Sequence, residues 1–204
     1  MGVERRLILA LETAVEGGSV SIWDQRRRTE VGGVIGKTGV SKAEDVLENV
    51  GMLIEKHSIE KADFDLVVSA TGVGSATGLK IGEATAKGLA RSLGCRYREI
   101  SLWEALAAVA IEKNSPAKIK AIYLPAGKGR IVGLRLHELR FVGDAEINTA
   151  GEICSSMRNS AESDYYVHEG LLKEIGDCSG TILISSNLAG YLNEFASDNE
   201  VKLD

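Results

Sequence analysis

Residues 70–94 read "ATGVGSATGLKIGEATAKGLARSLG" and are unusually rich in glycine and alanine. They follow "FDLVVSA" (64–70), whose continuous apolar centre is typical of a buried parallel strand. A helix is expected to begin after Gly74, because Ser75 can act as its N-cap. A strand, a glycine-rich turn and a helix of small residues predict an α/β fold in which something approaches this backbone closely.

The turn matches no standard phosphate-binding signature. A P-loop requires Lys and then Ser or Thr directly after its last glycine, but Gly78 is followed by Leu79. The dinucleotide fingerprint G-x-G-x-x-G fails by one residue, since the glycines here are Gly72, Gly74 and Gly78. Glu99, at the end of the next expected strand, could imitate the ribose-binding acid of that fold, so a NAD-type binding module is kept as a minor alternative.

Four small residues recur at every fourth position of the expected helix: Gly78, Gly82, Ala86 and Ala90. This spacing places them on one helix face. Glycine inside a helix costs about 1 kcal/mol relative to alanine, so a compensating close contact is expected. The contact could be a helix of the same chain or a helix of a partner protein, with the leucines of this segment covering the sheet.

The rest of the chain predicts two similar halves. Before residue 114 the order is three strands, a helix (41–58), a strand, the small-residue helix, a strand and a further helix. After the polar segment "NSPAK" (114–118) the same β-β-β-α-β-α-β-α order returns in degraded form. This repetition predicts a duplicated ribonuclease-H-like fold of the actin and hexokinase type of ATPase, with subdomains at 1–113 and 114–204.

Composition excludes several functional classes. The chain has 204 residues, 44% of them hydrophobic, which suffices for a stable core. Its net charge of −5 argues against a primary nucleic-acid binder. Three widely spaced cysteines form neither a disulfide framework nor a zinc motif, and no apolar run is long enough for a membrane span, so we expect a cytoplasmic protein.

Enzyme signatures are equally sparse. The histidines His57, His137 and His168 are isolated and lack metal-ligand spacing. Gly74-Ser75-Ala76 does not form the Gly-x-Ser-x-Gly elbow of a hydrolase. We therefore expect no catalytic residues, no metal and no cofactor, and a peptidase or other hydrolase activity is not expected.

Two segments resemble a known family. "ILALETAVEGGSVSIWD" (8–24) and "DLVVSATGVGSATGLKIGEATAKGLARSLGCRYREISLWEALA" (65–107) are similar to the TsaB/YeaZ family, which older annotation places with the M22 glycoproteases. The family's opening Asp-Thr-Ser stands here as Glu12-Thr13-Ala14. In its Gly-Pro-Gly-Ser-Phe-Thr-Gly-Leu-Arg motif, this chain has Val73, Ala76 and Lys80 instead of Pro, Phe and Arg.

The resemblance implies a non-catalytic scaffold protein. Such proteins pair with the catalytic homologue TsaD, joined by the ATPase TsaE, in threonylcarbamoylation of the tRNA adenosine beside the anticodon. They form homodimers when alone and contact tRNA only as part of the complex. The resemblance also places the pairing surface on the first two helices, which implies these interface residues: Val46, Val50, Ile54, Gly78, Gly82, Ala86 and Ala90.

The resemblance further implies a vestigial nucleotide or metal site formed by Glu12, Thr13, Gly72, Gly74 and Ser75. Actin-type catalysis needs a carboxylate at the end of the first strand to hold the metal and its waters. Glu12 keeps the charge but is one methylene longer, which displaces its oxygens. Two alternatives remain: a nucleotide-binding kinase or ATPase of this fold, and a diverged paralogue whose homodimer has another role.

Overall fold

The computed structural model describes residues 6–15, 17–36, 42–113, 119–126, 130–137, 140–158, 164–175, 181–185 and 187–200. The chain folds into two compact units. The first unit consists of Met1–Ala105 together with Asn187–Asp204, and the second of Leu106–Ser186. This division differs from the expected subdomains 1–113 and 114–204, because the last helix packs with the first sheet.

The first unit contains a five-stranded sheet in the order β3-β2-β1-β4-β5. Its strands are β1 (Leu7–Glu12), β2 (Ser19–Asp24), β3 (Thr29–Ile35), β4 (Phe64–Thr71) and β5 (Arg96–Ser101). β1 pairs with β2 in antiparallel and with β4 in parallel orientation. All six residues of β1 are buried, and the apolar run at 7–11 suits its central place in the sheet.

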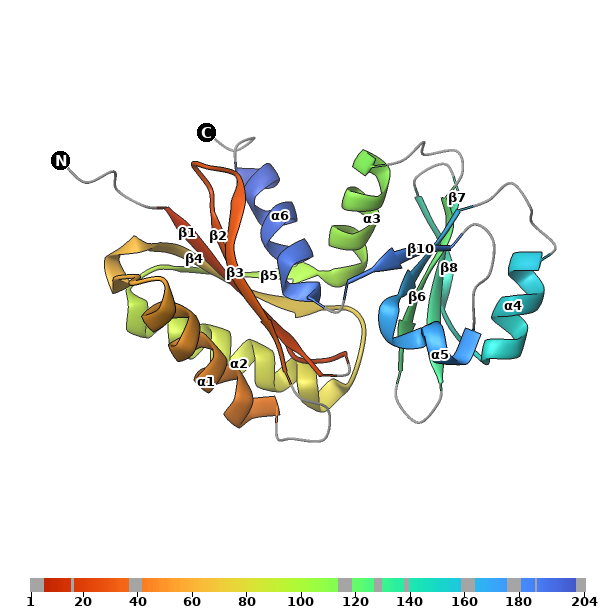
Figure 1. Cartoon of the computed structure of the whole chain (residues 1–204), viewed down its shortest axis with the longest axis horizontal. Coiled ribbons are helices and arrows are strands. Elements are labelled where there is room, and N and C mark those ends of the chain that lie inside the picture. Colours follow the sequence, from red (N-terminus) through yellow and green to blue (C-terminus); the bar gives the residue numbers. More distant parts are fainter. Residues whose placement is uncertain are drawn as a thin grey trace. The chain divides into compact units, whose positions relative to one another are not determined.

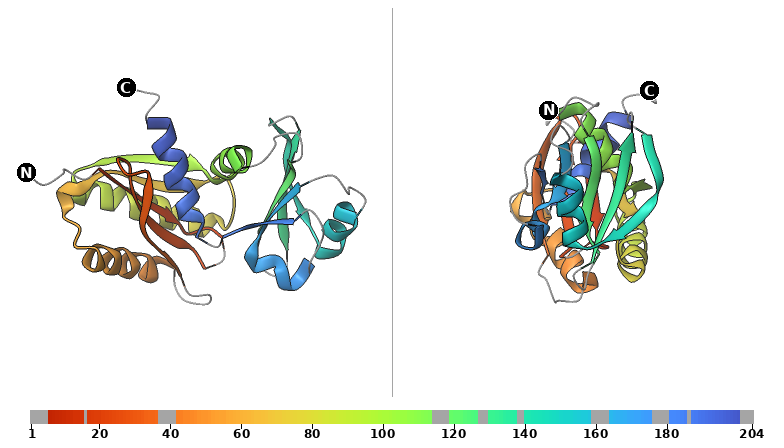
Figure 2. Two further views of the ribbon diagram at one scale, coloured as in Figure 1. Left: turned by 45° about the horizontal axis from the view of Figure 1, so that its top comes forward. Right: turned by 90° about the vertical axis from the view of Figure 1, so that its right-hand side faces the viewer.

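Helices cover both faces of this sheet (Figures 1 and 2). α1 (Lys42–Lys56) and α2 (Ala76–Leu93) lie on one face, and α6 (Leu188–Glu200) lies on the other. Because strand side chains alternate between faces, Leu9 and Leu11 join the core beneath α1 and α2. The sequence of α1 opens with Ser41 and Glu44 at the spacing of a capping box, but Ser41 lies outside the described residues.

The first unit also contains a 3-10 helix and the start of the helix that follows β5. A short 3-10 helix, η1 (Lys61–Asp63), connects α1 to β4. α3 (Leu102–Lys113) follows β5 directly, and the division between the two units falls within it.

The second unit contains a five-stranded sheet in the order β10-β9-β6-β7-β8. Its strands are β6 (Ile119–Pro125), β7 (Ile131–His137), β8 (Arg140–Asn148), β9 (Asp164–His168) and β10 (Thr181–Ile184). The helices of this unit are α4 (Ala150–Arg158), the 3-10 helix η3 (Glu169–Leu171) and α5 (Leu172–Ile175). Ile153 and Met157 of α4 pack with Tyr123 and Tyr165 of the sheet in one apolar cluster.

The two sheets have the same topology. Written from the other edge, the second order is β8-β7-β6-β9-β10, which repeats the first order strand for strand. Each half places three antiparallel strands before two parallel ones joined through helices. The predicted duplicated α/β fold is therefore confirmed.

Candidate functional site

The end of β1 and the turn after it form the centre of the candidate site. Glu12 is 1% exposed. Its Oε1 accepts hydrogen bonds from the backbone N–H groups of Ala14 and Val15, at 2.5 and 2.8 Å. The carboxylate therefore shapes the turn that leaves β1, because it satisfies backbone donors that would otherwise be buried without a partner.

This turn packs directly against the start of α2. The hydroxyl of Thr13 donates to the carbonyl oxygen of Gly78 at 2.7 Å. The backbone N–H of Ser75 donates to the carbonyl oxygen of Ala14 at 2.8 Å. Gly74 has a φ of +111°, and a Cβ there would lie 2.6 Å from the Ala14 backbone. Only glycine fits this position.

Four of the five residues predicted for a vestigial site thus come together, and one does not. Glu12, Thr13, Gly74 and Ser75 meet at the junction of β1 and α2. Gly72 lies apart from them, with Ser101 and Trp103 as the nearest neighbours of a Cβ added there.

Glu12 and Ser75 both hydrogen-bond to the backbone at this junction. Ser75 is the N-cap of α2, and its hydroxyl accepts the N–H of Gly78 at 3.2 Å. The inner side of this helix end, at Gly78, is filled by the backbone of Thr13 and Ala14, whereas residues 74–77 are exposed. No group of three or more His, Cys, Asp or Glu residues in the described part of the chain is placed to hold a metal ion.

The small-residue stripe also faces this junction, which corrects part of the predicted partner interface. Gly78, Gly82, Ala86 and Ala90 are the buried residues of α2. A Cβ at Gly78 would lie 2.3 Å from the Thr13 carbonyl oxygen, and one at Gly82 would lie 2.4 Å from Oγ1 of the same residue. The stripe therefore lets α2 approach the chain's own β1, and it is not available to a partner.

The predicted interface residues on α1 are also turned inward. Val46 and Val50 are 4% and 3% exposed and belong to the core beneath the helices. Ile54 is partly buried against the same core. Helical spacing correctly identified the apolar face, but this face covers the sheet.

The outer face of α1 and α2 carries exposed apolar residues and glycines that were not among the predicted interface residues. Leu47 and Met52 on α1 are 54% and 47% exposed. Gly51 on α1 and Gly88 on α2 have nothing within 4 Å of an added Cβ. Sequence analysis missed these residues, although a glycine outside the buried stripe of a helix could have signalled an open outer surface.

Charged groups accompany Gly88 on α2. The preceding Lys87 forms an ion pair with Glu83, and this hydrogen bond raises the pKa of Lys87. Its Nζ also lies 5.4 Å from the centre of the Tyr97 ring. Burial raises the pKa of Tyr97, whose hydroxyl shares a 2.8 Å hydrogen bond with Ser69. The Lys87 ammonium therefore joins α2 to β5, where it also lies 3.8 Å from Glu99.

A polar network missed by sequence analysis anchors α6 to β2. The hydroxyl of Ser19 accepts the backbone N–H of Ala189 at 2.9 Å. The hydroxyl of Ser21 accepts from Asn193 at 3.0 Å and donates to Glu30 at 2.6 Å. The alternation of Ser19 and Ser21 with apolar residues was visible in the sequence, but their partners lie about 170 positions away.

The repeated topology of the two sheets defines an α/β protein with a duplicated, actin-like fold. A family model described as "TsaD: tRNA N6-adenosine threonylcarbamoyltransferase" matches residues 21–180. The chain belongs to this family. No curated protein matches its sequence.

Solved structures agree with this assignment at the level of the fold. A Pseudomonas aeruginosa protein described as similar to peptidase YEAZ is 18% identical, with a TM-score of 0.65 over 97% of this chain and 93% of that one. YeaZ from Pseudomonas aeruginosa has the same identity and coverage and a TM-score of 0.60. A Bacteroides thetaiotaomicron protein with an actin-like ATPase fold is 10% identical, with a TM-score of 0.50 over 95% of each chain. The chain is thus YeaZ-like in its fold.

None of the described helices is both long and apolar enough to cross a membrane.

Proposed function

We propose that this chain is a non-catalytic scaffold subunit in the N6-threonylcarbamoyl modification of tRNA adenosine. Its partners would be a TsaD homologue, which carries out the transfer, and a TsaE-like ATPase. The chain would contact tRNA only as part of this complex. The family assignment supports the pathway, and the YeaZ-like fold supports the scaffold branch of the family. Such a role places the protein in the cytoplasm.

The state of the β1 junction supports the non-catalytic role. Glu12 accepts backbone hydrogen bonds within its own turn. Gly74 and Gly78 pack against the same turn so closely that a side chain at either position would overlap it. The residues that would hold a nucleotide in a catalytic relative therefore serve to join β1 to α2.

The pairing role rests on the exposed apolar residues and open glycines on the outer face of α1 and α2. The resemblance assigns pairing to these two helices, and their inner faces are occupied by the sheet. Their outer face exposes Leu47 and leaves open space over Gly51 and Gly88. Exposed apolar side chains beside bulk-free positions suit the close approach of a second helix. A homodimer of the isolated chain would use the same face.

The test is co-purification with the TsaD homologue of the same organism, followed by light scattering. We expect a one-to-one complex that Leu47→Asp weakens by at least about tenfold, since a Leu side chain buried at an interface contributes about 1.5–3 kcal/mol. Leu172→Asp is the matched control, because Leu172 is also exposed and lies on a helix of the second unit.

Both variants should retain the circular dichroism spectrum of the native chain. Equal affinity of the Leu47→Asp and Leu172→Asp variants would reject this surface. A homodimer that ignores TsaD would reject the scaffold role, and binding of ATP with magnesium in calorimetry would reject the non-catalytic assignment.

A further inference from the structure

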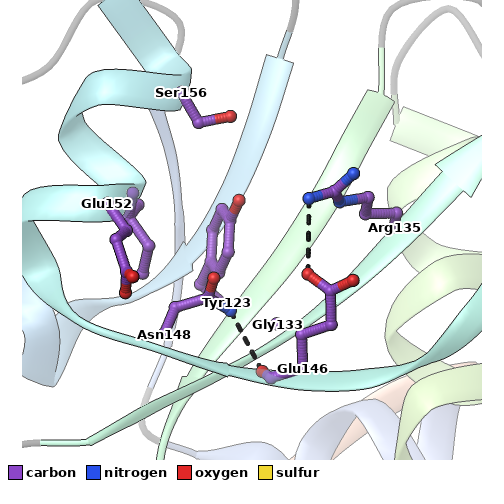
Figure 3. A pocket seen from close by; sticks show the side chains of 8 residues that line it. Tyr123, Gly133, Arg135, Glu146, Asn148, Glu152 and Ser156 are labelled. Carbon is purple, nitrogen blue, oxygen red and sulfur yellow. Dashed lines mark hydrogen bonds and ion pairs between the residues drawn. The ribbon is translucent and has the colours of Figure 1, made fainter.

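The second unit contains a hollow between its sheet and α4, distinct from the junction described above (Figure 3). It has a volume of about 180 Å³. This volume would hold about six water molecules at roughly 30 Å³ each, so its occupant must be small. The lining comes from β6, β7, β8 and α4, which bring together these side chains: Tyr123, Arg135, Glu146, Asn148, Glu152, Ile153 and Ser156.

A glycine shapes the floor of this hollow. Tyr123, Gly133 and Glu146 are neighbours across three adjacent strands. The Tyr123 ring lies over Gly133, where an added Cβ would be only 2.5 Å from ring atom Cε1. Any larger residue at position 133 would displace the ring. The ring is further fixed by stacking on Tyr165, with 6.3 Å between ring centres.

Neutral hydrogen-bonding groups lie in the middle of the hollow. Tyr123 is 6% exposed, and burial raises the pKa of its phenol, so the hydroxyl keeps its proton at neutral pH. In Figure 3 the hydroxyl of Ser156, from α4, points toward the same region. Both hydroxyls can donate and accept hydrogen bonds.

Charges of opposite sign stand on the two sides of these hydroxyls. On the strand side, the guanidinium of Arg135 pairs with Glu146 at 3.3 Å and has further N–H donors. On the helix side, Glu152 accepts hydrogen bonds from the backbone and hydroxyl of Thr149, which lower the pKa of its carboxyl. Glu152 is therefore ionised at neutral pH.

We propose that this hollow binds a small zwitterion of the size of a simple α-amino acid. The ligand's carboxylate would lie on Arg135, whose planar guanidinium suits carboxylate recognition. Its ammonium group would lie on Glu152, and its hydrogen-bonding atoms between Tyr123 and Ser156. The side chains supply one cation and two carboxylates, so a ligand with only a negative charge is disfavoured. The site does not depend on the proposed pairing function.

The test is a titration of the full-length ¹⁵N-labelled protein, followed by amide NMR shifts. L-Alanine is the zwitterionic probe, L-lactate replaces its ammonium group by a hydroxyl, and L-alaninamide removes its negative charge. We expect saturable shifts confined to residues 131–136 and 146–156 with L-alanine, and at least about fivefold weaker binding of the other two. Equal binding of L-lactate and L-alanine would overturn the proposal. The absence of a saturable shift at 20 mM L-alanine, roughly the weakest affinity expected of so small a ligand, would overturn it as well.

Variants then assign the contacts. Arg135→Gln should weaken L-alanine binding by about tenfold or more, because it removes a charge-assisted hydrogen bond. Arg158→Gln is the matched control, since Arg158 is exposed at the end of α4 and does not line the hollow. Tyr123→Phe keeps the ring and removes only the hydroxyl, and it should weaken binding by a few fold. Unchanged affinity in Arg135→Gln, with its spectrum otherwise native, would contradict the assigned orientation.

Discussion

Alanine substitutions at two glycines of α2 should change the stability of the protein in opposite directions. Gly78 and Gly88 lie on the same helix, and alanine at either position gains about 1 kcal/mol of helix propensity. A Cβ at Gly78 would meet the backbone of Thr13 and Ala14, at 2.3 and 2.8 Å. A Cβ at Gly88 would meet nothing within 4 Å.

The magnitudes follow from these contacts. Overpacking costs typically 1–3 kcal/mol, and the backbone contacts at Gly78 place it at about 3 kcal/mol. After the gain in propensity, Gly78→Ala should lower the free energy of unfolding by about 2 kcal/mol. Gly88→Ala should raise it by about 1 kcal/mol. For a chain of this size these values correspond to a Tm about 4–8 °C lower and about 2–4 °C higher, respectively.

Urea unfolding, followed by circular dichroism and tryptophan fluorescence, measures both changes. Gly51→Ala is a second control, because its added Cβ also meets open space on α1. If Gly78→Ala were as stable as Gly88→Ala, the small-residue stripe would not be in contact with the β1 turn, and our correction of the interface would fail.

Two further predictions concern a buried carboxylate and a buried phenol. Glu12→Ala should lower the free energy of unfolding by about 2–4 kcal/mol in urea titrations, because the N–H groups of Ala14 and Val15 lose a charged acceptor. A change below about 0.5 kcal/mol would show that the turn does not need the Glu12 carboxylate. The pKa of Tyr123 is raised in the folded state, so its contribution to stability is complete below its unfolded pKa of about 10 and is lost as the pH rises above that value. Native protein should therefore lose more stability than Tyr123→Phe between pH 9 and pH 11 (roughly one unit either side of that pKa), and parallel curves would contradict the burial of this phenol.

The order of elements could be predicted from the sequence, because each element carries its own local pattern. The segments 119–125, 131–137 and 181–184 are strands, as their β-branched and apolar runs indicate. The glycine-rich turn and Ser75 as N-cap were likewise readable, since cap and turn chemistry is local.

What covers a helix face could not be predicted in the same way. The spacing of Gly78, Gly82, Ala86 and Ala90 defines a face, but β1 of the same chain and a helix of a partner require the same absence of side chains. Only the tertiary position of Thr13 decides between them. For the same reason, the hollow around Tyr123 was invisible, because its lining depends on the pairing of three strands.

The first unit is assembled from two separated parts of the chain, because α6 packs on β1 and β2. On the ribosome the first sheet emerges early, the whole second unit follows, and the residues of α6 come last of the described elements. Until then, the face of β1 that carries Ile8 and Ala10 has no covering helix, and Ser19 and Ser21 lack their hydrogen-bond partners. Domains generally fold as units in the order of their synthesis. We therefore expect the second unit to reach its native form first, while the nascent first sheet depends on chaperones until the last helix is released.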